Sequence, residues 1–239
     1  MKTGEGHLLK KDASNYDSGK YEKPSVTVDI CICTQKHRDI YILLIKRKYP
    51  PFQDRWAIPG GFVSIEKKET LEQTAARELK EETGLENIYT EQLKTYGDPD
   101  RDPRMRIITV AYYALVSSKV ILDQEKTTIA GDDAKEYKWF SLTRPPEELA
   151  FDHKRILSDL LSRLRGKVCY TPIAFNFLPK KFTWNQLQEV YESILCRKLF
   201  APNFRRKIKS LYKIKILKST RKAFGRPATL LSFKGIKEL

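Results

Sequence analysis

Three glutamates are spaced so that they could bind a metal ion together. Glu78, Glu81 and Glu82 stand at i, i+3 and i+4, and in a helix this spacing places the carboxylates within one turn on one face. Like charges so close repel each other, and a divalent cation would stabilise them. Oxygen ligands favour Mg²⁺ or Mn²⁺ over Zn²⁺. The spacing predicts a site for a phosphate ester or anhydride, with a solvated glutamate-rich helix face as the alternative.

The surrounding residues predict the helix that would hold these glutamates. Thr70 and Gln73 have the spacing of a capping box, and Gly84 is placed to end the helix. The apolar positions between them recur at i, i+4 and i+8, as Leu71, Ala75 and Leu79. Ahead of the helix, Trp56–Val63 is interrupted by Pro59, Gly60 and Gly61, which predicts a tight loop at a working surface.

The run from Glu69 to Leu85 resembles the Nudix box, in which G, five residues, E and seven residues precede R-E-U-x-E-E-x-G-U, where U is aliphatic. Every specified position in this run matches, but seven residues instead of five separate Gly61 from Glu69. The resemblance implies that Arg77 pairs with Glu69 and that one glutamate orients or deprotonates the attacking water. It implies catalytic roles for Glu69, Arg77, Glu78, Glu81 and Glu82, with the last three and Gly61 as metal ligands.

A metal ion at this site would neutralise charge on a diphosphate and lower the pKa of the water that attacks phosphorus in line. The segment Gly97–Arg106 is similar to the substrate loop of Nudix proteins related to ADP-ribose pyrophosphatases. That similarity implies ADP-ribose as substrate, cleaved to AMP and ribose 5-phosphate. The cations that could bind it, unless they are ordinary surface cations, are Lys46, Arg47, Arg55, Arg101 and Arg104.

The positive charge of the chain is concentrated in its last third. The chain has a formal net charge of +15. Residues 1–165 hold 28 Lys and Arg against 27 Asp and Glu, whereas residues 166–239 hold 17 against 3. This asymmetry predicts two parts with different partners, and a polyanion such as nucleic acid suits the second part. A solvated basic face is the alternative.

The basic third has the element order of a winged helix. Thr183 and Gln186 form a second capping box, Ala201-Pro202 predicts a turn, and Asn203 could cap another helix. A hairpin is expected from Lys213–Ser219 and Ala228–Phe233. The apolar stripes of the two helices are Leu187, Val190, Tyr191 and Ile194, then Phe204, Ile208 and Leu211.

The segments Thr171–Thr183, Leu187–Glu192 and Asn203–Lys207 resemble the C-terminal winged helix of Nudix-related transcriptional regulators of NAD metabolism. The resemblance implies duplex DNA as a partner, with the second helix in the major groove, and a homodimer. Arg206, Lys209 and Lys213 are expected to point away from the apolar stripe. The candidate DNA-binding residues are Asn203, Arg205, Arg206, Lys209, Arg221 and Arg226.

The element pattern predicts an α/β fold, with a Nudix α/β/α sandwich containing a mixed sheet and a smaller winged helix behind it. Strands are expected at Ser25–Cys33, Ile40–Lys46, Ile107–Val116 and Lys135–Phe140, and a helix capped by Asp152. The expected divisions are a polar leader (1–24), the Nudix domain (25–150), a linking helix (151–166) and the winged-helix domain (167–239).

The composition, 41% hydrophobic and 31% charged, is that of a foldable protein. The sequence contains no uninterrupted apolar stretch long enough for a membrane span, so we expect a cytoplasmic protein. The four cysteines show neither zinc-ligand nor disulfide-framework spacing, and we expect them to be buried as small apolar residues. They are Cys31, Cys33, Cys169 and Cys196.

Two functions from different classes remain open. The chain could be a hydrolase with an accessory DNA-binding domain, or a transcription factor whose Nudix domain only senses ADP-ribose. The complete set of box residues favours catalysis. A structural or protein-binding role for the basic domain is a third possibility.

Overall fold

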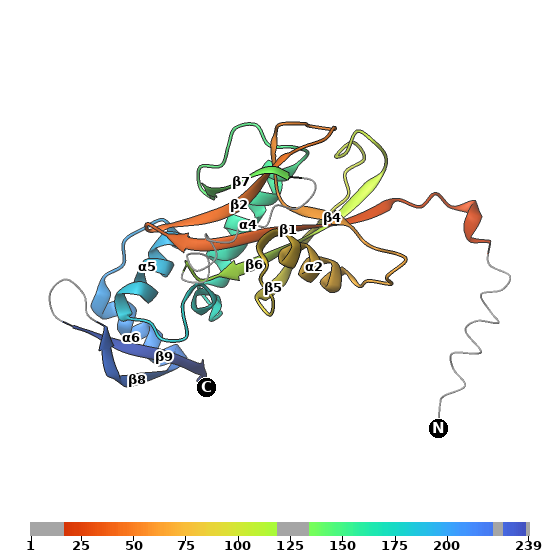
Figure 1. Cartoon of the computed structure of the whole chain (residues 1–239). Coiled ribbons are helices and arrows are strands. Elements are labelled where there is room, and N and C mark those ends of the chain that lie inside the picture. Colours follow the sequence, from red (N-terminus) through yellow and green to blue (C-terminus); the bar gives the residue numbers. More distant parts are fainter. Residues whose placement is uncertain (1–16, 119–133, 222–226, 238–239) are drawn as a thin grey trace, which may run out of the picture.

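The computed structural model describes residues 17–118, 134–221 and 227–237 (Figure 1). The candidate DNA-binding residue Arg226 and most of the polar leader lie outside these ranges. The short 3-10 turn η2 (Ser18–Lys20) leads into the sheet. The strands of this sheet are β1 (Ser25–Lys36), β2 (Asp39–Arg47), β3 (Trp56–Ala57), β4 (Gly60–Phe62), β5 (Tyr89–Tyr96), β6 (Ile107–Val116) and β7 (Ala134–Ser141).

The seven strands form one mixed sheet. Its main order is β3-β2-β1-β6-β5, with β4 paired to β1 and β7 paired to β2. The β1–β6 pair is parallel, and the other pairs are antiparallel. Strand β1 is therefore central, and its alternate side chains face the two sides of the sheet.

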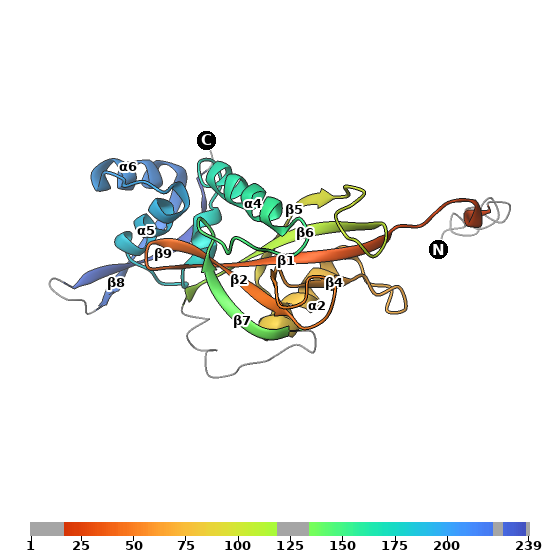
Figure 2. The same cartoon turned by 90° about the horizontal axis from the view of Figure 1, so that it is seen from above.

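A helix covers each face of the sheet (Figures 1 and 2). Helix α2 (Leu71–Thr83) packs through Ala75 and Leu79 on a buried cluster that includes Val28, Ile30 and Ile32 of β1. Helix α4 (His153–Lys167) packs on the opposite face, where its apolar stripe joins Cys31 and Cys33 in a second cluster. The expected α/β/α sandwich with a mixed sheet is confirmed.

The basic third forms the expected winged helix. It consists of the 3-10 helix η3 (Ile173–Phe177), the helices α5 (Trp184–Leu195) and α6 (Ala201–Leu211), and the antiparallel hairpin of β8 (Tyr212–Arg221) and β9 (Ala228–Ile236). The second capping box is present, because Thr183 and Gln186 exchange side-chain and backbone hydrogen bonds.

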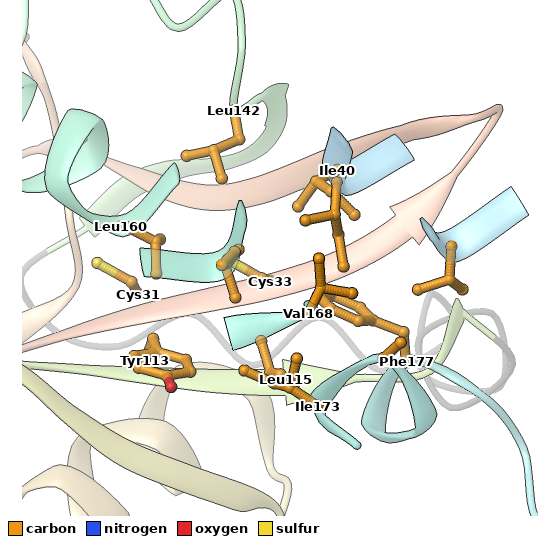
Figure 3. Close-up of a cluster of buried hydrophobic side chains, with 14 of the residues drawn as sticks. Cys31, Cys33, Ile40, Tyr113, Leu115, Leu142, Leu160, Val168, Ile173 and Phe177 are labelled. Carbon is orange, nitrogen blue, oxygen red and sulfur yellow. The ribbon is translucent and has the colours of Figure 1, made fainter. Parts of the chain in front are cut away.

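One continuous apolar core joins the two parts of the molecule. Figure 3 shows Cys33, Ile40 and Leu115 of the sheet packed with Val168 and with Ile173 and Phe177 of η3. The same cluster extends to Ile194 of α5 and Ile208 of α6. At the surface, the β1–β2 turn also meets α5 through an Arg38–Glu189 ion pair of 3.7 Å. The winged helix is therefore packed against the end of the sandwich.

Several local expectations were wrong. Asp152 occupies the N-cap position of α4 but makes no capping hydrogen bond, because both its carboxylate oxygens accept from Arg101. Helix α6 begins at Ala201 with Phe200 as N-cap, so Ala201-Pro202 is helical and Asn203 is not the cap. Lys213 lies in β8, the hairpin strand expected from Lys213 onward, so it does not share a helix face with Arg206 and Lys209.

Two further differences concern the cysteines and a strand. Cys31 and Cys33 are fully buried as expected, whereas Cys169 and Cys196 are exposed. Strand β5 (Tyr89–Tyr96) was not expected, since its alternation is mostly polar. Among the described residues, none of the helices combines the length and the apolar character needed to cross a membrane.

Candidate functional site

Helix α2 positions the glutamates, and both its ends are formed by local hydrogen bonds. The Thr70 hydroxyl accepts from the Gln73 amide at 3.2 Å, while the Gln73 side chain accepts from the Thr70 amide at 2.8 Å. Gly84 ends the helix in the left-handed region with φ 67°, which glycine adopts without steric strain. The three glutamates therefore lie on the last helical turns.

Arg77 lies at the centre of an acidic cluster formed by Glu69, Glu78 and Glu81. Its Nε donates to Glu69 Oε1 at 3.0 Å, so the pairing implied by the Nudix resemblance is present. Its Nη1 donates to Glu78 Oε1 at 2.7 Å and to Glu81 Oε2 at 2.9 Å. Nη2 donates to the Phe62 carbonyl at 3.2 Å. The hydrogen bond with Arg77 is the main cause that lowers the pKa of Glu69.

The three glutamates differ in exposure. Glu78 is buried, with 6% of its surface exposed, and Glu82 is half-buried, while 52% of the Glu81 side chain is exposed. Burial raises the pKa of Glu78, and the positive charge of Arg77 opposes that shift. A buried carboxylate with a raised pKa is typical of functional sites.

Gly61 lies directly against Glu78. A β-carbon added at Gly61 would lie only 2.2 Å from Glu78 Oε1. The close approach requires glycine, and it places the backbone of β4 beside the carboxylate.

The two additional residues between Gly61 and Glu69 form a separate turn. The Lys68 amide donates to the Ile65 carbonyl at 3.1 Å, and the Glu69 amide donates to the Ser64 carbonyl at 3.1 Å. Ile65 is 88% exposed at the tip of this turn. The insertion is therefore accommodated outside the cluster, and Gly61 and Glu69 still reach their partners on α2.

The donor chemistry of this cluster fits a hard divalent cation. Within the described ranges, no three acidic, histidine or cysteine side chains are already arranged to hold an ion. Glu78 and Glu81 nevertheless both direct an oxygen at one cationic nitrogen, Arg77 Nη1. Their carboxylates can thus reach a common positive charge, and a metal ion would have to take the place of the guanidinium.

A cleft of about 150 Å³ is lined in part by Gly61. It is lined by residues from β1, β2, β4, the 101–107 segment and the start of α4. Three of the predicted substrate-binding cations line it, namely Arg47, Arg101 and Arg104. The other two do not: Lys46 pairs with Glu136 at 3.8 Å, and Arg55 pairs with Glu148 at 3.5 Å.

Arg101 forms the buried floor of the cleft. Its guanidinium donates to both oxygens of Asp152, at 2.7 and 3.1 Å, and lies 3.7 Å from Asp29. Only 4% of its side chain is exposed. A buried bidentate pair of this kind fixes geometry, so Arg101 would meet a ligand directly only if the pair with Asp152 opened.

Arg104 lies at the mouth of the cleft between two aromatic rings. Its Cζ is 5.8 Å from the Phe62 ring centroid and 5.9 Å from that of Phe151. Asp102 holds it through hydrogen bonds of 2.8 and 3.0 Å. Although burial opposes the shift, these bonds lower the pKa of Asp102. Arg47 also lies over Phe151, at 5.0 Å. The walls are thus cationic and aromatic, as nucleotide recognition requires.

Sequence reasoning missed the polar residues Asp29 and His153 at the back of the cleft. The Ile58 amide donates to His153 Nδ1 at 2.8 Å, and His153 Nε2 is 3.9 Å from Asp29 Oδ2. Both side chains are buried. The one available signal was an aspartate inside the apolar run of β1.

Replacing Gly61 by alanine is expected to displace Glu78, because the new methyl group would overlap its carboxylate. We expect Mn²⁺ affinity, measured by titration calorimetry, to fall at least about tenfold, as for other changes that misplace metal ligands. The loss in unfolding free energy should stay near 1–3 kcal/mol, typical of overpacking. Gly97→Ala is the matched control, since its β-carbon would meet only Ile108, at 3.6 Å. Equal Mn²⁺ affinity in both variants would contradict the assignment.

Burial lowers the pKa of His153 from its usual 6.5. In the unfolded chain His153 therefore binds a proton near pH 6.5, whereas in the folded protein it stays neutral at that pH. The unfolding free energy should accordingly fall as the pH drops below that value. The slope from one such group is at most about 1.4 kcal/mol per pH unit. Urea unfolding between pH 7.5 and 5 should show that His153→Asn removes this slope. The exposed His37 provides the control, because His37→Asn should retain it.

The candidate DNA-binding residues of α6 form a basic surface opposite its buried stripe. Asn203, Arg205, Arg206 and Lys209 are all exposed, whereas Phe204 and Ile208 are buried. Asn203 Oδ1 accepts from Arg206 at 3.2 Å. Arg221 is the last residue of β8, and its backbone pairs with Ala228 of β9.

Comparisons with known proteins agree with both parts. Residues 23–160 match the family model described as the NUDIX domain, and residues 174–233 match the NrtR DNA-binding winged helix domain. The chain is 34% identical to the "ADPR responsive transcriptional repressor NtrR" of Acinetobacter baylyi, over 92% of this chain and 86% of that protein. It is 43% identical to the "ADP-ribose pyrophosphatase" of Methanocaldococcus jannaschii, over 66% of this chain and 85% of that protein.

The fold is also similar to the crystal structure of Shewanella oneidensis NrtR complexed with a 27mer DNA. The TM-score is 0.75 at 33% identity, covering 87% of this chain and 93% of that chain. The two family matches cover successive parts of the sequence, as the charge division had predicted. The chain therefore belongs to the Nudix hydrolase family and carries, behind its Nudix domain, a DNA-binding winged helix of the NrtR type.

Proposed function

We propose that this protein hydrolyses a nucleoside diphosphate derivative, with ADP-ribose cleaved to AMP and ribose 5-phosphate, and that its winged helix binds duplex DNA. The observation that carries the proposal is the buried Glu78 carboxylate packed against Gly61, at the edge of a cleft with cationic and aromatic walls. The 43% identity to an ADP-ribose pyrophosphatase supports the choice of substrate.

In this proposal the residues of the cleft orient the diphosphate. Arg104 and Arg47 would bind phosphate oxygens, and Phe62 and Phe151 would pack against the flat groups of the ligand. Arg101 keeps its pair with Asp152 and fixes the floor of the cleft. A glutamate of α2 would accept the proton of the attacking water, and in-line attack at phosphorus then needs no covalent intermediate.

Nudix proteins generally use divalent metal ions, and we propose Mg²⁺ or Mn²⁺ here. Glu78, Glu81, Glu82 and the backbone of Gly61 would hold the ion, since all are oxygen donors. When bound, the ion supplies positive charge that stabilises the diphosphate during phosphoryl transfer. Glu69, which lies 3.0 Å from Arg77, would keep Arg77 anchored if Glu78 and Glu81 turned to the ion.

A specific observation favours a second function, that of a sensor that binds ADP-ribose without hydrolysing it. Arg77 already neutralises Glu78 and Glu81, and the relative from Acinetobacter baylyi is described as an ADPR-responsive repressor. In that case ligand binding in the cleft would change DNA binding by the packed winged helix. Both activities can coexist in one chain.

Chromatography of ADP-ribose incubated with the full-length protein and Mg²⁺ tests the proposal. Release of AMP and ribose 5-phosphate supports hydrolysis. If calorimetry shows that ADP-ribose binds but no product is released, the protein is a sensor and not a hydrolase. If ADP-ribose is neither bound nor hydrolysed, the proposal of a nucleotide ligand is wrong. Dinucleotides and oxidised nucleotides should be included as competing substrates.

We further propose that the protein is a homodimer and that it binds its DNA in the cytoplasm. We also propose that the linking helix 151–166 divides the chain into its two domains. The exposed apolar side chains Val26 and Met105 support self-association, since Ser25, at the start of β1, touches Met105 and brings them to one end of the sheet. Light scattering of the purified chain tests the dimer, which a monomeric mass would contradict.

A further inference from the structure

A second cationic cleft lies in the winged helix, and it shares only Lys209 with the candidate DNA-binding residues. It has a volume of about 400 Å³ and separates the end of α6 and the start of α5 from the β8–β9 hairpin. Five lysines and one tryptophan line it, namely Trp184, Lys209, Lys213, Lys215, Lys234 and Lys237. Of these, only Lys209 was predicted to bind DNA.

Negative charge is absent from the described lining of this cleft. Residues 166–239 contain only three acidic residues. Glu189 pairs with Arg38 at 3.7 Å and Glu192 with Lys198 at 3.1 Å, both away from the start of α5, and Glu238 lies outside the described residues. The charged residues that line the cleft within the described part of the chain are therefore all positive, and a polyanion would neutralise them.

Trp184 connects the start of α5 to the cations of α6. It is the first residue of α5, directly after the Thr183 cap. Arg205 Cζ lies 5.9 Å and Lys209 Nζ 5.7 Å from its ring. Cations at this distance are attracted by the negative face of the ring. The half-buried tryptophan thus restrains two exposed side chains that would otherwise be free to rotate.

We propose that this cleft binds the sugar–phosphate backbone of duplex DNA beside the bases approached by α6, and that Trp184 positions Arg205 and Lys209 for it. The proposal rests on the proposed DNA binding of the winged helix. Lysine ammonium groups are point charges without the fork geometry that reads base edges, so they suit phosphates. Contacts of this kind give affinity and orientation without sequence information.

The main test is the variant Lys215→Gln, Lys234→Gln, Lys237→Gln in the full chain. Fluorescence anisotropy with a mixed-sequence duplex should be measured across salt concentrations. Each lost phosphate contact lowers the slope of log affinity against log salt by about 0.9, so we expect a decrease of about 2 to 3. The control, Lys67→Gln, Lys68→Gln, Lys154→Gln, removes three exposed charges of the Nudix part and should retain the slope.

A triple variant with the slope of its control would overturn the proposal, provided that the unaltered protein binds the duplex. No binding by the unaltered protein would instead refute the proposed DNA-binding function itself. The cleft could also hold a small anion. If the triple variant binds DNA normally but loses thermal stabilisation by inorganic pyrophosphate, the cleft is a small-anion site and the proposal fails.

Trp184 is tested separately, as a positioning residue. Trp184→Leu should weaken duplex binding about five- to thirtyfold, the loss expected for two exposed cation–π contacts, and Trp184→Phe should restore most of it. In an Arg205→Ala, Lys209→Ala background, Trp184→Leu should have no further effect, because the groups it positions are absent. If Trp184→Leu weakens binding in that background as much as it does in the unaltered protein, and circular dichroism shows a folded chain, Trp184 does not act through these cations.

Discussion

Glu82→Gln is expected to reduce ADP-ribose hydrolysis by at least about a hundredfold, the effect of removing a group that accepts a proton or a full charge in the transition state. Glutamine has the same shape and keeps the half-buried position on α2, so the melting temperature should change little. Release of AMP under saturating Mg²⁺ is the measurement. Loss of activity with an unchanged fold would assign the defect to chemistry.

Glu86→Gln is the matched control for this prediction. Glu86 follows α2 and pairs with Lys80 at 2.6 Å, and 56% of its side chain is exposed. This variant removes the same charge near the same helix and should retain full turnover. If Glu82→Gln also turns over normally, the carboxylates of α2 do not perform the roles proposed for them.

Removing the two arginines of α6 should have the second large effect. The Arg205→Ala, Arg206→Ala variant is expected to lose at least about tenfold in affinity for duplex DNA near physiological salt, with the salt slope smaller by about 2. Both side chains are exposed on the face opposite the buried stripe, so the fold should persist. Anisotropy titration at several salt concentrations measures both quantities.

Arg106→Ala, Arg144→Ala is the corresponding control, since both arginines are exposed in the Nudix part. It removes equal charge and should leave the slope unchanged. If both variants lose the same affinity for DNA, binding depends only on the net charge of the protein. Helix α6 would then have no specific role in DNA binding.

The predictions that succeeded rest on local signals. The two capping boxes, the glycine that ends α2 and the apolar run of β6 each involve residues within a few positions, so sequence spacing is sufficient to read them. The prediction that Asn203 caps the helix was wrong because Pro202 suits the first turn of a helix. The helix therefore begins at Ala201, three residues earlier than a cap at Asn203 would place it.

What the sequence could not give is mostly non-local. Arg101 is 51 residues from Asp152, and His153 is 95 residues from its partner Ile58. No spacing rule brings such residues together, because only the complete sheet places them at one cleft. Five predicted substrate cations thus reduced to three that line the cleft, and the polar residues behind them were found only from the fold.

Arg77 has a consequence for metal dependence. Because its guanidinium lies between Glu78 and Glu81 at 2.7 and 2.9 Å, the protein carries an internal counter-ion for its own acidic cluster. We therefore expect the protein to fold without a bound metal ion. A chelator such as EDTA should abolish hydrolysis reversibly without unfolding the chain. Binding of a metal ion would replace the Arg77 guanidinium by the ion as the positive partner of these carboxylates. The rate of hydrolysis would therefore depend on the concentration of free Mg²⁺.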